Sequence, residues 1–377
     1  MDNYLGKDIF KLGFGLMRLP KTKSGKIDIQ HTCKMIDKFI EAGGTYFDTA
    51  FVYDNGKSEK ATKLALVDRY PREKFLLTTK LCAWQKCHDE ESAKQQFYTS
   101  LERTGAGYFD FYLLHALTRT NYKKYDDYHI WDFVKELKSK GLIKHFGFSF
   151  HGDSNLLEEL LTLHPDVDFI QLQINYADWE NPDIESRNCY EIALKHKVPI
   201  TIMEPIKGGS LANPISPVKS IFDKANKKLN QNLSYASWAI RFAASLDGII
   251  TVLSGMSNLE QVEDNISYMK NFVPLSDYEK SVIKEVQTVL SDNTLIPCTA
   301  CHYCTDGCPK QIPIPEIFDI KNKMQTHSLS DCKKDYISVT KNRGKASDCI
   351  QCKKCENSCP QHLKIIEFLN ECRIFEE

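Results

Sequence analysis

Eight short apolar segments alternate with helical patterns before residue 291, and this alternation restricts the chain to few folds. The segments are nearly continuous in hydrophobic residues, as strands are when both faces of a sheet are covered. Strands that alternate with helices predict a parallel sheet with helices packed against it. The expected strands are residues 12–16, 45–48, 75–80, 109–114, 145–149, 169–173, 199–203 and 249–253.

Eight such units in fewer than 300 residues fit a closed (β/α)₈ barrel, the TIM barrel. The alternative is a doubly wound open sheet. The first turn after a strand, residues 13–25, has no G-x-G-x-x-G that opens directly into a helix, which favours the barrel. Ser276 and Glu279 form a capping box at the start of a late helix. The expected helices include residues 29–42, 90–103, 131–140, 184–197, 258–270 and 276–290.

The cysteines are concentrated at the end of the chain. Of the 14 cysteines, only Cys33, Cys82, Cys87 and Cys189 precede residue 290. A secreted disulfide protein spreads its bridges through the fold, whereas this distribution indicates a metal module joined to an intracellular enzyme. We therefore expect a barrel domain at residues 1–291 and a cysteine-rich domain at residues 292–377.

The cysteine-rich region contains the pattern C-x-x-C-x-x-C-x-x-x-C-P twice, which is the spacing of bacterial ferredoxins. In this arrangement three closely spaced cysteines bind one [4Fe–4S] cluster, and the cysteine before proline binds the other cluster. The first predicted ligand set is Cys298, Cys301, Cys304 and Cys359, and the second is Cys349, Cys352, Cys355 and Cys308.

Zinc is the alternative metal for these cysteines. Zinc sites favour two C-x-x-C pairs separated by a spacer rather than three cysteines in series, so the spacing favours iron–sulfur clusters. About forty residues separate the two motifs, and residues 312–324 between them are helical in pattern. We expect a mainly α-helical ferredoxin-like domain, with the additional Cys332 and Cys372 in structural positions.

Composition excludes several function classes. The net charge of −1 gives no basis for binding nucleic acid or an anionic membrane. No apolar run is long enough for a transmembrane helix, and the first residues lack the apolar stretch of a signal peptide. We expect a cytoplasmic protein with 42% hydrophobic and 26% charged residues, enough for a large core.

Four polar residues follow three successive expected strands, at the end where a barrel of this type carries its chemistry. Asp48 ends the second strand, and Tyr53 lies shortly after it. Lys80 ends the third strand, and His115 follows the fourth. Each residue alone has an ordinary explanation, such as a helix cap or a solvated side chain, but together they indicate a catalytic site.

The segments around these residues resemble the aldo/keto reductase superfamily over roughly residues 5–290. The resemblance rests on Asp48-Thr49-Ala50 with Tyr53, on T-T-K at Lys80, on D-x-x-L-L-H at His115, and on G-F-S at Ser149, Gln171 and residues 254–265. It implies a (β/α)₈ barrel that binds NADP(H) in an extended form without a Rossmann motif. It further implies that a related branch appends the cysteine motif found here.

The four residues have a coherent chemical role. Reducing a carbonyl group leaves an oxyanion that needs a proton, and a free phenol with a pKa near 10 is a weak donor. We expect the Lys80 ammonium to lower the pKa of Tyr53, the general acid. Bringing this pKa near 7 would take about 4 kcal/mol. Asp48 would hold Lys80, and His115 would orient the carbonyl oxygen.

The resemblance also implies cofactor contacts. Ser149 and Gln171 would hold the nicotinamide carboxamide, and Met203 stands where the family has a stacking aromatic residue. Ser257 and Gln261 occupy positions where NADP-dependent members have a cation, so NADP and NAD both remain open. The remaining expected contacts are Glu204, Gly208, Gly209, Ser254, Gly255 and Asn265.

Nicotinamide transfers two electrons as hydride, whereas a [4Fe–4S] cluster transfers one, so direct exchange needs an intermediary. The first interpretation is an oxidoreductase that interconverts an aldehyde or ketone and its alcohol, coupled to or stabilised by the clusters. The alternatives are flavin-mediated electron transfer and a non-catalytic redox-sensing barrel. The expected partners are a small carbonyl or alcohol substrate and a ferredoxin or other electron-transfer protein.

Overall fold

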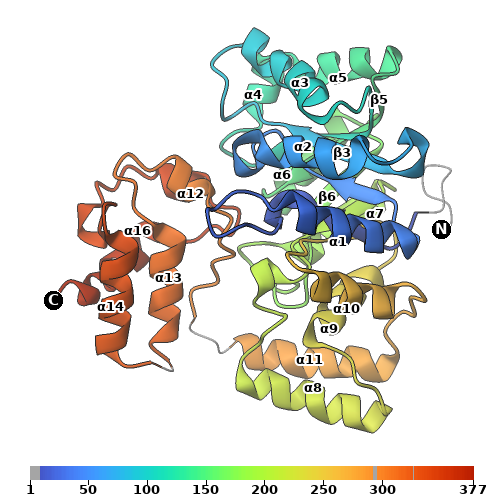
Figure 1. Cartoon of the computed structure of the whole chain (residues 1–377). Helices are drawn as coiled ribbons and strands as arrows, with labels where there is room; N and C mark the ends of the chain where they lie inside the picture. Colours follow the sequence, from blue (N-terminus) through green and yellow to red (C-terminus); the bar gives the residue numbers. More distant parts are fainter. Residues whose placement is uncertain (1–8, 292–294, 326) are drawn as a thin grey trace. The chain divides into compact units, whose positions relative to one another are not determined.

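The computed structural model describes residues 9–291, 295–325 and 327–377 (Figure 1). The chain forms two compact units. The barrel unit comprises the chain up to Ile206 and Pro214–Gln287, and the cysteine-rich unit comprises Lys207–Asn213 and Thr288–Glu377. The domain boundary expected at residue 292 lies outside the described residues. A seven-residue segment after the seventh strand thus belongs to the cysteine-rich unit, which the sequence did not predict.

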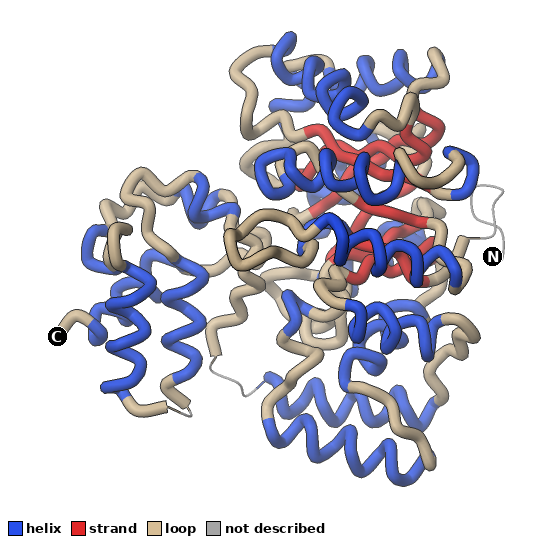
Figure 2. Tube along the Cα trace, viewed as in Figure 1, coloured by secondary structure: helices blue, strands red, loops and turns tan. Residues whose placement is uncertain are grey.

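Eight parallel strands close into a barrel in chain order, with β8 paired to β1. The predicted barrel is therefore confirmed, and the open doubly wound sheet is excluded. Figure 2 shows the strands enclosed by helices. The strands are β1 (Leu12–Gly15), β2 (Tyr46–Asp48), β3 (Leu76–Leu81), β4 (Phe109–Leu117), β5 (Ile143–Phe150), β6 (Phe169–Gln173), β7 (Ile200–Met203) and β8 (Ile249–Ser254).

The amino-terminal half of the barrel interior is filled by large apolar side chains. Tyr46 and Phe169 both pack on Phe111, with ring centroids 5.0 Å apart in each pair. Ile9, Leu76, Leu113, Ile250 and Leu253 complete this cluster. Because this end is closed by packing, the polar residues that follow along the same strands are displayed at the carboxyl end.

The helices of the barrel unit bury one apolar face against the strands. Helix α1 (Ile29–Glu41) shows the local rules: the Asp28 side chain caps the His31 amide, and Met35, Ile36 and Phe39 are buried. The expected capping box is also present, because Ser276 and Glu279 each accept a bond from the other's backbone amide. The other helices are α2 (Lys57–Thr62), α3 (Glu90–Thr104), α4 (Lys123–Asp127), α5 (Ile130–Ser139), α6 (Ser154–Leu163), α7 (Ser186–Lys195), α8 (Ser216–Leu229), α9 (Tyr235–Ala244), α10 (Leu259–Met269) and α11 (Asp277–Ser291).

The cysteine-rich unit is helical, as expected, and the structure assigns no strand to its described residues. Its helices are α12 (Tyr303–Asp306), α13 (Ile314–Lys323), α14 (Leu329–Thr340), α15 (Lys354–Asn357) and α16 (Ile365–Glu371). Cys332 and Cys372 are buried in its core together with Ile317, Phe318 and Tyr336. Among the described residues of the whole chain, no helix is both long and apolar enough to cross a membrane.

Candidate active site and cysteine pockets

The Lys80 side chain is the centre of the candidate active site. Its ammonium is fully buried and donates to the Asp48 carboxylate at 2.5 Å and to the Thr49 carbonyl at 2.8 Å. The third contact is with the Tyr53 hydroxyl at 3.2 Å. Since an ammonium has three protons, each of them has a partner, and this fixes the phenol relative to the carboxylate.

His115 completes the group that the sequence predicted. Its ring meets the Tyr53 ring edge to face, with centroids 5.7 Å apart and planes at 76°. The His115 carbonyl accepts bonds from the Tyr125 hydroxyl at 2.6 Å and from the Trp84 indole at 3.1 Å. These bonds hold the backbone that carries the imidazole beside Tyr53.

Burial sets the protonation states of this group. Burial raises the pKa of Tyr53 above its ordinary value, and the Lys80 ammonium opposes this only in part. The Lys80 ammonium acts on the Tyr53 pKa in the expected direction, but burial outweighs it, and this pKa does not approach neutrality in this structure. The reason is that a fully buried phenol loses the solvation of its charged form, and one ammonium that is already paired with Asp48 does not replace it.

Two of the other three titratable groups, Lys80 and His115, also have definite states at neutral pH. Burial disfavours a charged Lys80, but Asp48 and Tyr53 outweigh it and raise the pKa of Lys80, which stays cationic. Burial, aided by the Lys80 charge, lowers the pKa of His115 well below its ordinary value, so the imidazole is neutral. The site at neutral pH thus holds a protonated phenol, an ammonium and a neutral imidazole.

Ser149 and Gln171 are paired across β5 and β6, beside the four catalytic candidates. The Ser149 hydroxyl accepts a bond from the Ala116 amide at 2.7 Å, next to His115. The Gln171 amide donates to the second oxygen of the Asp48 carboxylate at 3.2 Å. Both side chains therefore lie at the site, and their role toward a carboxamide stays a prediction.

The residues after β7 divide between the two units. Met203 is partly buried at the strand end, and the Glu204 carboxylate is close enough to Tyr53 to raise the pKa of that phenol slightly further, after the effects of burial, Lys80 and Asp48. Gly208 and Gly209 belong instead to the cysteine-rich unit. A side chain at Gly208, where φ is 66°, would come within 2.7 Å of the Thr299 backbone. Their expected contact with a pyrophosphate stays a prediction.

The segment after β8 is held by its own hydrogen bonds. The Asn265 amide donates to the Ser254 hydroxyl at 2.9 Å, and the Ser257 amide donates to the Gln261 side chain at 2.7 Å. These four expected cofactor residues therefore form one ordered turn, together with Gly255. Their role toward a cofactor stays a prediction.

Arg18 is a residue that the sequence reasoning missed. It follows β1, and its carbonyl accepts a bond from the Ser257 hydroxyl at 2.7 Å across 239 positions of sequence. A Cβ at Gly255 would lie 3.4 Å from Cδ of Arg18, so the arginine side chain runs along this turn. The structure thus supplies a cation where Ser257 and Gln261 offered none. A basic residue directly after the first strand was the available signal, since β1 and β8 are neighbours in any closed barrel.

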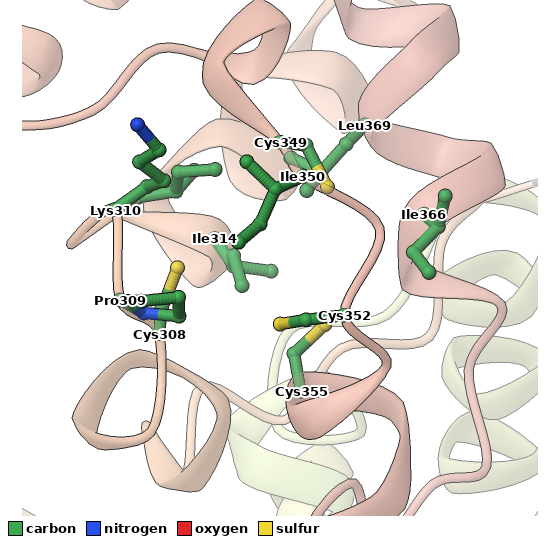
Figure 3. Close-up of a pocket in the computed structure, with 11 residues that line it drawn as sticks. Cys308, Pro309, Lys310, Ile314, Cys349, Ile350, Cys352, Cys355, Ile366 and Leu369 are labelled. Atoms are coloured by element: carbon green, nitrogen blue, oxygen red, sulfur yellow. The ribbon is translucent and has the colours of Figure 1, made fainter.

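The cysteines of the two motifs gather in two pockets of the cysteine-rich unit. Cys359 joins Cys298, Cys301 and Cys304 in one pocket. Figure 3 shows the other, where Cys308 joins Cys349, Cys352 and Cys355. Each pocket therefore combines three cysteines of one motif with the last cysteine of the other, which is the combination that the spacing predicted.

The chemistry of both pockets suits a cluster rather than a single ion. Four thiols surround each space, and Ile314 lines both. The rest of each lining is mainly apolar, with Lys310 in one pocket and Thr299, His302 and Gln361 in the other. Among the residues that the structure describes, no three His, Cys, Asp or Glu side chains converge tightly enough to hold one metal ion. Thiolates spread around a larger space match the four irons of a cube.

Residues 11–288 match the profile of the aldo/keto reductase family. The chain belongs to this family. Residues 297–364 match the profile of the 4Fe-4S dicluster domain, so the chain is an aldo/keto reductase-type oxidoreductase with a C-terminal dicluster domain. The functional class predicted from the sequence is confirmed at this level.

Curated relatives cover the barrel part of the chain. The Yersinia pestis methylglyoxal reductase DkgA is 26% identical over 271 residues, 70% of this chain and 84% of the relative. The Escherichia coli NADH-specific methylglyoxal reductase is 25% identical over 292 residues, 68% of this chain and 88% of the relative. The Bacillus subtilis oxidoreductase YqkF is 24% identical over 284 residues, which are 69% of this chain and 87% of the relative.

Solved structures agree on the fold. The holo form of aldo-keto reductase AKR11C1 from Bacillus halodurans superposes with a TM-score of 0.60 at 23% identity, covering 74% of this chain and 93% of that one. An aldo/keto reductase from Klebsiella pneumoniae in complex with NADP and acetate superposes with a TM-score of 0.58 at 18% identity, covering 74% of this chain and 92% of that one. The barrel of this chain therefore has the aldo/keto reductase fold.

Proposed function

We propose that the barrel reduces small aldehydes or ketones with a nicotinamide cofactor and that Tyr53 donates the proton. The observation that carries the proposal is the contact of the buried Lys80 ammonium with both the Asp48 carboxylate and the Tyr53 hydroxyl. In the reverse reaction, oxidation of an alcohol, Tyr53 would start as the phenolate and accept the hydroxyl proton, while Lys80 stays an ammonium and His115 stays neutral.

The proposed chemistry balances as a hydride plus a proton. The nicotinamide, when bound, supplies the hydride to the carbonyl carbon. Tyr53 gives its hydroxyl proton to the carbonyl oxygen, and the adjacent Lys80 ammonium stabilises the phenolate that remains. The neutral His115 imidazole orients the substrate oxygen beside the Tyr53 ring. Asp48 keeps the ammonium in place throughout.

We propose Arg18 as the cation for the phosphate groups of the cofactor, with Ser254, Gly255, Ser257, Gln261 and Asn265 forming the turn around it. Arg18 contacts this turn through its carbonyl and its side chain. A guanidinium is also well suited to binding phosphate. A contact of this cation with the 2′-phosphate would favour NADP over NAD, whereas a contact with the pyrophosphate would serve both. The nicotinamide end would meet Ser149, Gln171 and Met203. No observation in the barrel favours a flavin or a purely sensing role.

Methylglyoxal is the first substrate to assay, because two relatives are named for its reduction. We expect Tyr53→Phe to lower kcat by at least a hundredfold while the Kd for NADPH, measured by fluorescence titration, stays within twofold. Tyr98→Phe is the matched control, since Tyr98 is exposed on α3 and should retain wild-type activity. Wild-type turnover by Tyr53→Phe would contradict the proposed proton donor.

A further inference from the structure

The second cysteine pocket reaches the protein surface through its central loop. Of the eight motif cysteines, Cys352 is the exposed one. Ile350 lines the same pocket and is 57% exposed, although isoleucine is usually buried. A cluster held here would therefore lie directly beneath an exposed apolar side chain.

Exposed lysines accompany this loop. Lys310 lines the pocket (Figure 3), and Lys353 and Lys354 directly follow Cys352 in the sequence; all three are exposed. Lys345 is also exposed, and its turn packs on the Lys310 backbone, since a Cβ on the adjacent glycine would lie 2.2 Å from the Lys310 carbonyl. We call Lys310, Lys345, Lys353 and Lys354 the lysine rim.

Three carboxylates close to the rim are engaged in hydrogen bonds with the backbone. Asp348 is exposed and caps its own turn by accepting the Lys345 amide at 2.8 Å. Glu356 is partly buried and accepts the Ile366 amide at 3.0 Å. The Glu376 carboxylate, which accepts the Ser347 amide at 3.0 Å, also lies near Lys345. The four lysines therefore outnumber these three carboxylates, each of which is engaged with the backbone, by one.

The first cysteine pocket lacks such a rim. Its lining holds neither lysine nor arginine, and Thr299 between its first two cysteines is buried. If lysines served only to offset the negative charge of a cluster, both pockets would need them. Exposed Lys364 adjoins the lining of the first pocket, between Leu363 and Ile365, whereas Lys310 itself lines the exposed pocket and three further rim lysines accompany it. The larger number of lysines at the exposed pocket indicates a function at the surface.

We propose that the lysine rim and Ile350 form the docking surface for an acidic protein that carries a one-electron redox centre. An apolar residue ringed by charges of one sign is the pattern of a transient interface, in which complementary charge steers the encounter. Each encounter moves one electron: the carrier's centre is oxidised by one, and the cluster held by Cys308, Cys349, Cys352 and Cys355 is reduced by one, or the reverse. This inference rests on the dicluster domain and not on the proposed carbonyl reduction.

The test uses the cluster-loaded full chain and a purified acidic plant-type [2Fe–2S] ferredoxin, reduced chemically and mixed under anaerobic stopped flow. We expect the second-order rate to fall steeply with added salt, because the charges are exposed and screened. Lys353→Glu/Lys354→Glu should slow the reaction at least tenfold at low ionic strength, and the difference should vanish at high ionic strength.

The matched control is Lys333→Glu/Lys334→Glu on α14, which makes the same charge change away from both pockets. It should react at the wild-type rate. Lys345 lies outside the cysteine loop, so Lys345→Glu should not affect cluster loading. This variant should also slow the reaction, and it keeps the test valid if the double variant loads its cluster poorly. Ile350→Ser should raise the Kd for oxidised ferredoxin measured by calorimetry.

Three results would overturn the proposal: equal rates for the rim and control variants, slowing that is independent of salt, or slowing explained by a changed reduction potential of the cluster. The last would mean that the lysines tune the cluster instead of binding a partner. In the Tyr53→Phe variant, electron transfer between ferredoxin and the cluster should proceed at the wild-type rate. A failure of the proposed carbonyl reduction is therefore distinguishable from a failure of the proposed docking surface.

Discussion

The Arg103 guanidinium lies 3.1 Å from the carboxylate of Glu59, a side chain with no exposed surface. The same guanidinium nitrogen donates to the Phe51 carbonyl, also at 3.1 Å. The other Glu59 oxygen accepts from the Thr79 hydroxyl at 2.7 Å. Thr79 precedes Lys80 and Phe51 lies two residues before Tyr53, so this ion pair connects the backbone of both catalytic candidates.

We expect Arg103→Ala to destabilise the protein by about 3 kcal/mol, because it leaves the buried Glu59 carboxylate without its cation. Activity should also fall, since the loop that carries Tyr53 loses an anchor. Urea unfolding and kcat measure the two effects. Arg119→Ala is the control: its ion pair with Asp153 is exposed, and its loss should cost less than about 1 kcal/mol. Equal stabilities of the two variants would contradict the assigned role.

The direction of the Tyr53 shift predicts an unusual pH profile for carbonyl reduction. Because burial raises the pKa of Tyr53 above about 10, the phenol keeps its proton through the neutral range. The lowered pKa of His115 likewise removes a transition near its usual value of about 6.5. We expect kcat/KM to be flat from about pH 6 to 9 and to fall only in more alkaline solution. A limb centred near pH 7 would show that the bound cofactor changes this balance.

Removing the Arg18 cation should weaken cofactor binding. Hydrogen bonds to charged groups contribute about 1.5–3 kcal/mol, so Arg18→Ala should raise the Kd for NADPH by roughly tenfold to a hundredfold. A larger effect on NADPH than on NADH would assign Arg18 to the 2′-phosphate, and an equal effect would assign it to the pyrophosphate. Fluorescence titration gives both constants. Arg187→Ala, an exposed arginine elsewhere on the barrel, should bind both cofactors normally, and an unchanged Kd in Arg18→Ala would exclude the role.

The crossed grouping of the cysteines can be tested by single replacements. Cys359→Ser and Cys301→Ser should affect the same cluster, while Cys308→Ser should affect the cluster that includes Cys352. Iron analysis should give about four irons per chain in place of about eight if a replaced cluster is lost. Cys332→Ser, at a buried cysteine outside both pockets, should keep the full iron content. Loss of the Cys301 cluster in Cys308→Ser would contradict the grouping.

The local patterns of the sequence predicted much of the candidate site. Asp48, Lys80 and His115 could be identified because each follows an apolar run, and parallel strands place their carboxyl ends at one rim. Tyr53 could be identified by its spacing from Asp48 in the sequence. Arg18 was missed because its partner Ser257 is at the other end of the barrel sequence, although its position directly after the first strand was an available signal. Glu59 and Arg103 look like ordinary surface charges until the fold brings them together.

The sequence by itself determined the eight strands, the barrel and the crossed cysteine pockets. Hydrophobic periodicity and cysteine spacing are local patterns, so they can be recognised without knowing which distant segments are in contact. Only the tertiary structure decided that Tyr53 stays a protonated phenol, that Arg18 lies along Gly255, and that Lys207–Asn213 belongs with the cysteine-rich unit. Each of these three findings depends on which segments pack around a side chain and shield it from solvent. Burial and closure of the barrel are properties of the whole chain, and no short stretch of sequence contains them.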